Sequence, residues 1–266
     1  MLSSAVSVSI ARAADAVLYD DRDRIGVRNV VVAVTAVAWV VSIWTARVTS
    51  MHVHARGTNA LPVALSASVN WLLMLTAMMA PVLIEPIQFI RGQGFASRRT
   101  RATLLFLAGY SSAWTIAGAV MLLIAARVHS AMLAPVIPAA AALAFAALVQ
   151  CSPAKQVCLN QCHVRTALAA FGWRADTDAI NFGATYAGWC IGSCGAWMLV
   201  PLILPGSHSP AMMAVAILTF CERLEKPAPP AWHWRGLGTA SRIVARQVQM
   251  RLRIGRLHTR STLISS

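Results

Sequence analysis

The sequence is poor in charged residues. Charged side chains make up 12% of the 266 residues and only 9 residues are Asp or Glu, whereas 58% are apolar. A soluble domain has about 25% charged residues, so an ordinary soluble enzyme is excluded. A chain of this length accommodates about six membrane-spanning helices of ~20 residues each. We therefore predict one all-α domain, a polytopic bundle of transmembrane helices.

The sequence also lacks the common catalytic motifs. It has no Gly-rich phosphate loop, no Ser nucleophile elbow, no His-Glu-x-x-His motif and no paired carboxylates within the apolar stretches. No catalytic residue is assigned, and a protein that is not an enzyme is favoured. Residues 1–17 lack the basic start of a signal peptide, so we expect the first span to serve as the targeting signal.

Six apolar stretches are expected to cross the membrane. They are residues 29–46, 62–84, 103–126, 131–150, 179–203 and 208–224. The third and fourth are separated by little more than Arg127–Ser130, which predicts a tight helical hairpin. Residues 1–28 and 227–266 are then an N-terminal segment and a basic tail on either side of the transmembrane domain, residues 29–226.

The distribution of basic residues predicts the orientation. With six spans, 20 Lys and Arg residues fall on one side, including nine from Arg223 to the end of the chain. The opposite side has only Arg47, Arg56 and Arg127. Positively charged loops stay in the cytoplasm, so both termini are predicted to be cytoplasmic.

The basic tail has an arginine stripe. If residues 241–260 are helical, five arginines lie within an arc of ~80°. They are Arg242, Arg246, Arg253, Arg256 and Arg260. A basic helix beside a membrane binds anionic lipid headgroups at about 1 kcal/mol per charge. We favour this interpretation over nucleic-acid binding, because no interleaved aromatic residues or nucleic-acid motif accompany the stripe.

A short helix with two cysteines is predicted in the fourth loop. Ser152 is a suitable N-cap and Pro153 suits the first helical position. Cys158 and Cys162 are four residues apart, so they lie on one face of that helix, and His163 follows them. This cluster is a candidate cytoplasmic site for capturing a metal ion.

A second group of sulfur atoms is predicted within the bilayer. Cys190 and Cys194 share one face of the fifth span. At a rise of ~1.5 Å per residue, Cys190, Met74 and Met212 lie about 15–18 Å from the inner ends of their spans, and Met78 lies one turn further inward. Thiolate and thioether ligands select Cu(I), so we expect copper as the ligand. The alternative is that these residues are ordinary core side chains, as methionine often is.

The fifth span also has a stripe of small residues. Gly188 and Gly192 belong to it and lie ~200° away from the sulfur stripe. Small residues at this spacing allow another helix to approach closely, so these glycines are expected to pack against a helix or a partner membrane protein.

Three segments of the chain resemble a family of bacterial membrane proteins. They are Trp71–Pro81, Ser152–Cys162 and Gly188–Met198, with Glu225-Lys226 following them. The sequence of these segments is similar to DUF2182, whose members are integral membrane proteins predicted to bind metal. The resemblance covers residues 61–230 and implies a metal-binding protein of the bacterial inner membrane. Ser193 stands where many members have a further Cys, and His163 where Arg is usual.

Three functions are consistent with these observations. The first is a multipass membrane protein that binds a soft metal ion, Cu(I), and moves or delivers it. The second is a membrane assembly or accessory subunit with structural cysteines. The third is a membrane thiol oxidoreductase that uses Cys190 and Cys194. Stoichiometric copper in the purified protein would separate the first from the other two.

Overall fold

The computed structural model of the chain is all-helical in the residues that it describes. These are residues 21–45, 60–93, 95–131, 136–169, 171–204 and 208–236, with further positions between 238 and 249. The elements are an N-terminal helix Asp21–Thr45, α2 Ala60–Met79, η2 Ala80–Leu83, α3 Ile84–Gln93, η3 Ala96–Arg98, α4 Arg99–Ala131, α5 Val136–Cys151, α6 Pro153–Gln161, α7 Gly172–Ile203 and α8 His208–Arg223. The predicted all-α fold is confirmed for this part of the chain.

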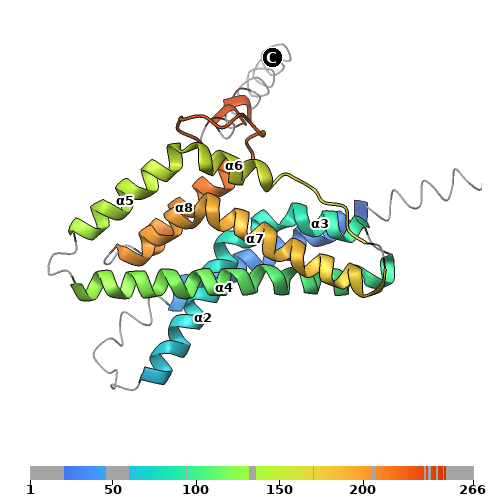
Figure 1. Cartoon of the computed structure of the whole chain (residues 1–266), viewed down its shortest axis with the longest axis horizontal. Helices are drawn as coiled ribbons and strands as arrows, with labels where there is room; N and C mark the ends of the chain where they lie inside the picture. Colours follow the sequence, from blue (N-terminus) through green and yellow to red (C-terminus); the bar gives the residue numbers. More distant parts are fainter. Residues whose placement is uncertain are drawn as a thin grey trace, which may run out of the picture.

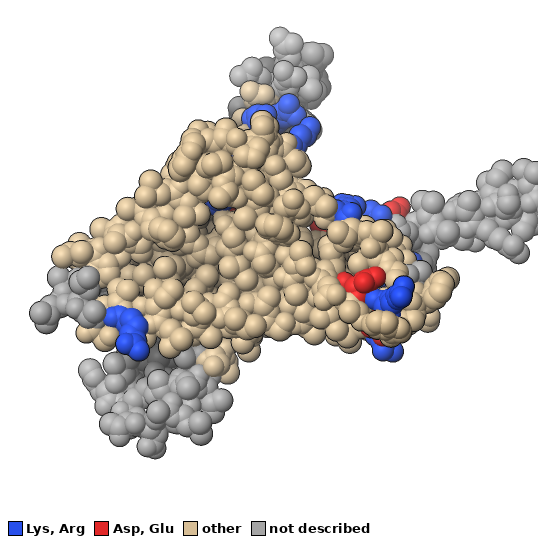
Figure 2. All heavy atoms as spheres, in the orientation of Figure 1, with Lys and Arg blue, Asp and Glu red and all other residues tan. Residues whose placement is uncertain are grey.

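Several helices are long and apolar enough to cross a membrane. Four segments meet this condition: the N-terminal helix, residues 68–93, α4 and α7. The bent pair α5–α6 adds a fifth if it forms one span. The expected sixth span corresponds to α8, which has 16 residues. Figure 2 shows a broad uncharged surface, with Lys, Arg, Asp and Glu gathered mainly near helix ends.

Three helix boundaries differ from the expected ones. The N-terminal helix is already formed at Asp21, the first described residue, and thus extends beyond the expected start at residue 29. Helix α7 begins at Gly172 instead of residue 179, since Asp176 on its first turns pairs with arginines near the start of α4. Helix α4 continues through Arg127–Ser130, so the predicted hairpin turn is not there.

Helices α4 and α7 lie side by side along the molecule (Figure 1). Two glycines bring their backbones together. A Cβ atom at Gly109 would lie 2.1 Å from the carbonyl oxygen of Ile180, and one at Gly183 would lie 2.1 Å from that of Phe106. No side chain fits at such distances. The contact therefore depends on glycine, and it places α7 in the centre of the bundle, where α5, α6 and α8 also pack against it.

The chain bends by 66° between α5 and α6. Ser152 is the N-cap of α6, and its hydroxyl accepts a hydrogen bond from the backbone N–H of Lys155. Pro153 occupies the first turn, where it has no hydrogen bond to lose. This confirms the start predicted for the cysteine-bearing helix, and the bend directs α6 across α7.

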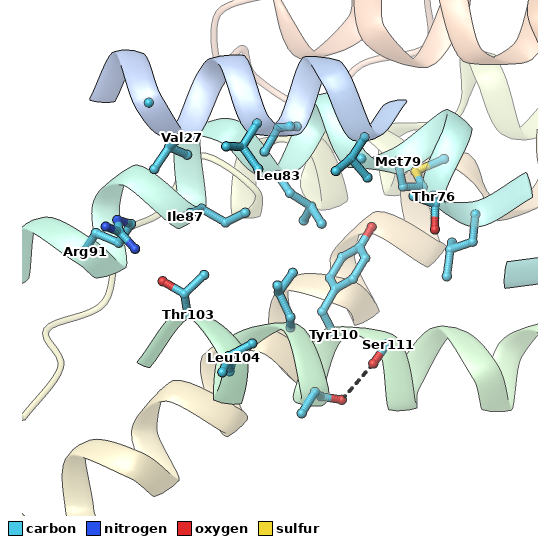
Figure 3. Close-up of a pocket in the computed structure, with 18 of the residues that line it drawn as sticks. Val27, Thr76, Met79, Leu83, Ile87, Arg91, Thr103, Leu104, Tyr110 and Ser111 are labelled. Carbon is cyan, nitrogen blue, oxygen red and sulfur yellow. Dashed lines mark hydrogen bonds between the residues drawn. The ribbon is translucent and has the colours of Figure 1, made fainter. Parts of the chain in front are cut away.

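An apolar cleft of about 810 Å³ lies between the N-terminal helix, α2, α3 and α4 (Figure 3). At one end, the guanidinium group of Arg91 donates two hydrogen bonds to the carboxylate of Asp23, at 2.5 and 2.9 Å. Tyr110 reaches from α4 into the space toward α2, and its buried hydroxyl has no hydrogen-bond partner in the part of the chain that the structure describes. No cysteine lines the cleft, so the candidate sulfur site lies elsewhere.

Candidate metal centre

The contact between α6 and α7 brings the two predicted cysteine pairs together. The thiols of Cys162 and Cys190 lie close enough to interact, and both residues are buried. Sequence analysis placed Cys162 in a cytoplasmic site and Cys190 in a separate site deep in the membrane. The two pairs adjoin because α6 folds back onto α7 after the bend at Ser152.

The environment of Cys162 favours the protonated form of its thiol. The interaction with the neighbouring thiol of Cys190 and the burial of the side chain raise the pKa of Cys162 well above its usual value. A soft metal ion reverses this preference, because thiolates are its ligands and the thiol protons are displaced on binding. Ion binding at this pair therefore releases protons.

Cys158 and Cys194 flank the thiol pair. A Cβ atom at Gly192 would lie 2.6 Å from the sulfur of Cys158, so this glycine leaves room for that half-buried thiol against α7. The thiol of Cys194 donates a hydrogen bond of 3.0 Å to the carbonyl oxygen of Cys190. Cys194 is thus buried within its own helix, whereas Cys158 lies on the side of α6.

Arg223, the last residue of α8, reaches the same pair. One amino group of its guanidinium donates to the sulfur of Cys190 at 3.0 Å and to the hydroxyl of Ser193 at 3.3 Å. The guanidinium carbon lies 5.8 Å from the centre of the Tyr186 ring, in cation–π geometry. Sequence analysis missed this role, since Arg223 was grouped with the other basic residues of the C-terminal end.

The predicted methionine ligands belong to the same buried cluster as the thiols. Met74 and Met78 come from α2 and Met212 from α8, and all three are buried in the core that includes Cys162 and Cys190. Met198 of α7 is also buried in this core, although only the other three were singled out as ligands. The structure therefore gathers soft sulfur atoms from four helices in one region.

His163 follows Cys162 and is half-buried. Burial and the positive charge of Arg223 lower the pKa of its imidazole. The neutral imidazole, which is the form that binds metals, is therefore favoured at this position. His52 and His54 lie outside the described residues, as do Arg253, Arg256 and Arg260 of the predicted lipid-binding stripe.

The remaining predicted residues are peripheral to this cluster. Arg242 and Arg246 of the stripe are exposed. Among the described residues, no atom lies within 4 Å of a Cβ atom placed on Gly188, so its predicted packing partner is not within this part of the chain. The described residues contain no group of three or more His, Cys, Asp or Glu side chains suited to a metal ion. A metal centre here would consist of the two thiolates, with thioethers nearby.

A buried polar network fixes α6 beside this centre. The ammonium group of Lys155 donates to a carboxylate oxygen of Glu222 at 2.7 Å and to the side-chain oxygen of Gln150 at 2.5 Å. Gln150 in turn donates to Glu222 and accepts from the indole N–H of Trp197, both at 2.5 Å. Lys155 was expected to be a charged residue of a cytoplasmic loop, but it is 1% exposed because this ion pair holds it inside.

The segment after α8 closes over the network. The guanidinium group of Arg235 donates to the side chain of Gln156 at 2.5 Å and to the carbonyl oxygen of Ser152 at 2.9 Å. Glu225 accepts hydrogen bonds from the backbone N–H groups of Gly236 and Gly238. The start of α6 is thus tied to the C-terminal segment as well as to α8.

Comparison with known proteins identifies a family. A family model described as PpoB2, copper chaperone, matches residues 68–245. No curated protein and no solved structure matches the chain. The match carries this description and not the name DUF2182, and the matched region includes the thiol pair, Arg223 and the buried methionines. Since the model matches more than half of the sequence, the chain belongs to the PpoB2 family of copper chaperones.

Proposed function

We propose that this protein is a polytopic copper chaperone of the bacterial inner membrane that carries Cu(I) between the thiolates of Cys162 and Cys190. The observation that carries the proposal is the proximity of these two thiols, contributed by two different elements, within one buried core. Thiolate ligands select Cu(I), and the family is described as one of copper chaperones. Copper is the cargo of the protein in this proposal.

The surroundings of the thiol pair suit a soft, weakly hydrated ion. Met74, Met78 and Met212 supply thioethers and no competing hard ligand. The nearest buried carboxylate, Glu222, is already neutralised by its ion pair with Lys155. A hard cation such as Mg²⁺ prefers oxygen ligands and would bind only weakly to these sulfur ligands.

Delivery of the ion requires a ligand that exchanges with a partner protein. Cys158 is the suitable residue, because it lies next to the centre on α6 and is less buried than Cys162 and Cys190. The ion would pass from the buried pair to Cys158 and from there to a partner. His163 offers a further neutral ligand on the same side.

We place α6 and both termini on the cytoplasmic side, with α8 as the sixth span. The excess of Lys and Arg residues on that side supports this orientation. Cysteine labelling can test it. Cys158 should react with an impermeant maleimide only after the cells are opened, and labelling of Cys158 from outside intact cells would reverse the orientation.

Copper analysis tests the proposed site. Protein purified anaerobically in detergent and loaded with Cu(I) should hold about one ion per chain, and Cys162→Ser or Cys190→Ser should hold far less. Cys151→Ser and Cys221→Ser are matched controls, because these free cysteines lie outside the buried thiol cluster. Equal copper in wild type and Cys190→Ser would eliminate the site.

A thiol oxidoreductase is the second candidate, and the adjacency of Cys162 and Cys190 is the observation in its favour. The pair expected from the sequence, Cys190 and Cys194, is less suited, since the thiol of Cys194 is bonded to the backbone of its own helix. Protein that binds no Cu(I) and is isolated with a disulfide between Cys162 and Cys190 would favour this function.

A further inference from the structure

The positive charge beside the thiol pair has a consequence for the choice of ion. When a metal ion displaces both thiol protons to solvent, Cys162 and Cys190 carry two negative charges. A monovalent ion leaves one of these uncompensated, and the guanidinium of Arg223, 3.0 Å from the sulfur of Cys190, balances it. The centre with Cu(I) and Arg223 is then neutral, which is the state that a buried environment favours.

A divalent ion gives a different net charge at the same site. Two thiolates already neutralise Zn²⁺, so the charge of Arg223 would be left over in a buried environment. The other charges near the thiols do not remove it, because Lys155 and Glu222 cancel each other at 2.7 Å. Glu85 acts on His163 and Tyr186, at the edge of the cluster.

The buried position of Arg223 beside Cys190 also leaves donors of its guanidinium unpaired among the described residues. Its Nε and one terminal nitrogen are buried and have no hydrogen-bond partner among the described residues, although buried donors are normally paired. Only the other terminal nitrogen is used, on Cys190 and Ser193. A residue with a purely structural role would be expected to satisfy its donors, as Arg235 does through contacts with Gln156 and the backbone.

We propose that Arg223 is a specificity-determining residue, which makes the Cys162–Cys190 centre selective for monovalent soft cations over divalent ones. This inference rests on the proposed Cu(I) site. Arg223 does not ligate the ion; it acts through its charge on the thiolate of Cys190. The selectivity follows from charge balance and is separate from the preference of sulfur ligands for soft ions.

Two soft ions of different charge provide the first test, in the wild-type protein. Ag(I) and Cd(II) both prefer thiolates and differ in charge. Ag(I) should displace bound Cu(I) from the full-length protein in detergent at a concentration at least tenfold lower than Cd(II). Displacement by Cd(II) as effective as that by Ag(I) would overturn the proposal without any mutation.

Substitution of the arginine provides the second test. Arg223→Met keeps much of the side-chain volume and removes the charge, so the ratio of Cu(I) affinity to Zn(II) affinity should fall at least tenfold. Arg223→Lys keeps the charge and should restore most of the ratio. Arg165→Met is the matched control, because Arg165 is exposed and outside the thiol cluster, and it should leave the ratio unchanged.

The outcomes separate the two proposals. An unchanged affinity ratio in a folded, copper-binding Arg223→Met variant would overturn the role of Arg223 and leave the copper site intact. Failure of wild type to bind Cu(I), or equal binding by Cys190→Ser, would instead overturn the proposed function. If Arg223→Met does not fold, equal displacement of Cu(I) by Ag(I) and Cd(II) in the wild type still overturns the proposal.

Discussion

Two polar clusters lie side by side where α6, α7 and α8 meet, and they differ in how well their groups are paired. In the cluster around Lys155 and Glu222, each charge has an opposite charge, and Gln150 joins them through hydrogen bonds. In the cluster around Cys190, Arg223 donates to the sulfur of Cys190 and keeps two buried nitrogens that have no hydrogen-bond partner among the described residues.

The difference suggests a division of tasks. A fully paired buried network holds elements in one arrangement, because a change in any member leaves another unsatisfied. A buried cation with unpaired donors is poorly explained by stability, and its charge is balanced when the two thiolates bind a monovalent ion. We therefore interpret the first cluster as the support that positions α6 and the second as the site that it serves.

The largest effect is expected when the paired cluster is broken. Glu222→Gln leaves the ammonium group of Lys155 buried without a counter-charge, and breaking a buried ion pair costs about 3–5 kcal/mol. The apparent melting temperature in detergent should drop markedly. The double variant Lys155→Met/Glu222→Leu removes both charges and should recover part of the loss. A stable Glu222→Gln protein would show that the pair does not support α6.

An intermediate effect is expected at the glycine contact between α4 and α7. Gly183→Ala places a methyl group against the carbonyl oxygen of Phe106, and overpacking of this kind costs about 1–3 kcal/mol. Gly188→Ala is the control, since its Cβ would meet no atom of the described residues within 4 Å. Thermal unfolding should separate the two variants, and equal melting temperatures would contradict the close helix contact.

The smallest effect on stability is expected within the sulfur cluster. Met212→Leu conserves volume in the core and should cost less than about 1.5 kcal/mol. A thioether is a weaker ligand than a thiolate, so copper affinity should fall only modestly, and much less than in Cys190→Ser. Both are measured by competition with a Cu(I) chelator. A loss of copper as large as that of Cys190→Ser would make Met212 a principal ligand.

Much of the fold follows from local patterns in the sequence. The long apolar runs predicted the helices, because a long stretch without charged residues favours a helix buried in a membrane or a protein core, where water is excluded. The start of α6 was predicted correctly because Ser152 and Pro153 act on the adjacent turn. Boundaries were missed where polar residues continue a helix, as at the start of α7, because their partners are distant in sequence.

The glycines show where sequence patterns become ambiguous. The chain has small residues on more than one face of α7. On the predicted face, a Cβ at Gly188 would meet no described atom within 4 Å, whereas one at Gly192 would lie 2.6 Å from the sulfur of Cys158. Gly183, on another face, makes the close contact with α4. The spacing of small residues shows which faces of a helix allow another helix to approach closely. The position of the neighbouring helix decides which of these faces makes the contact.

The sequence by itself determined an all-helical chain, rich in apolar residues, with two cysteine pairs at helical spacing and methionines at matching depth. Only the tertiary structure decided that Cys162 and Cys190, from different pairs, lie together and that Arg223 joins them. Spacing along one helix reports which residues share its face, but contacts between elements depend on the bend at Ser152 and on helix packing. Those are long-range properties, set by how the helices bury their surfaces against one another.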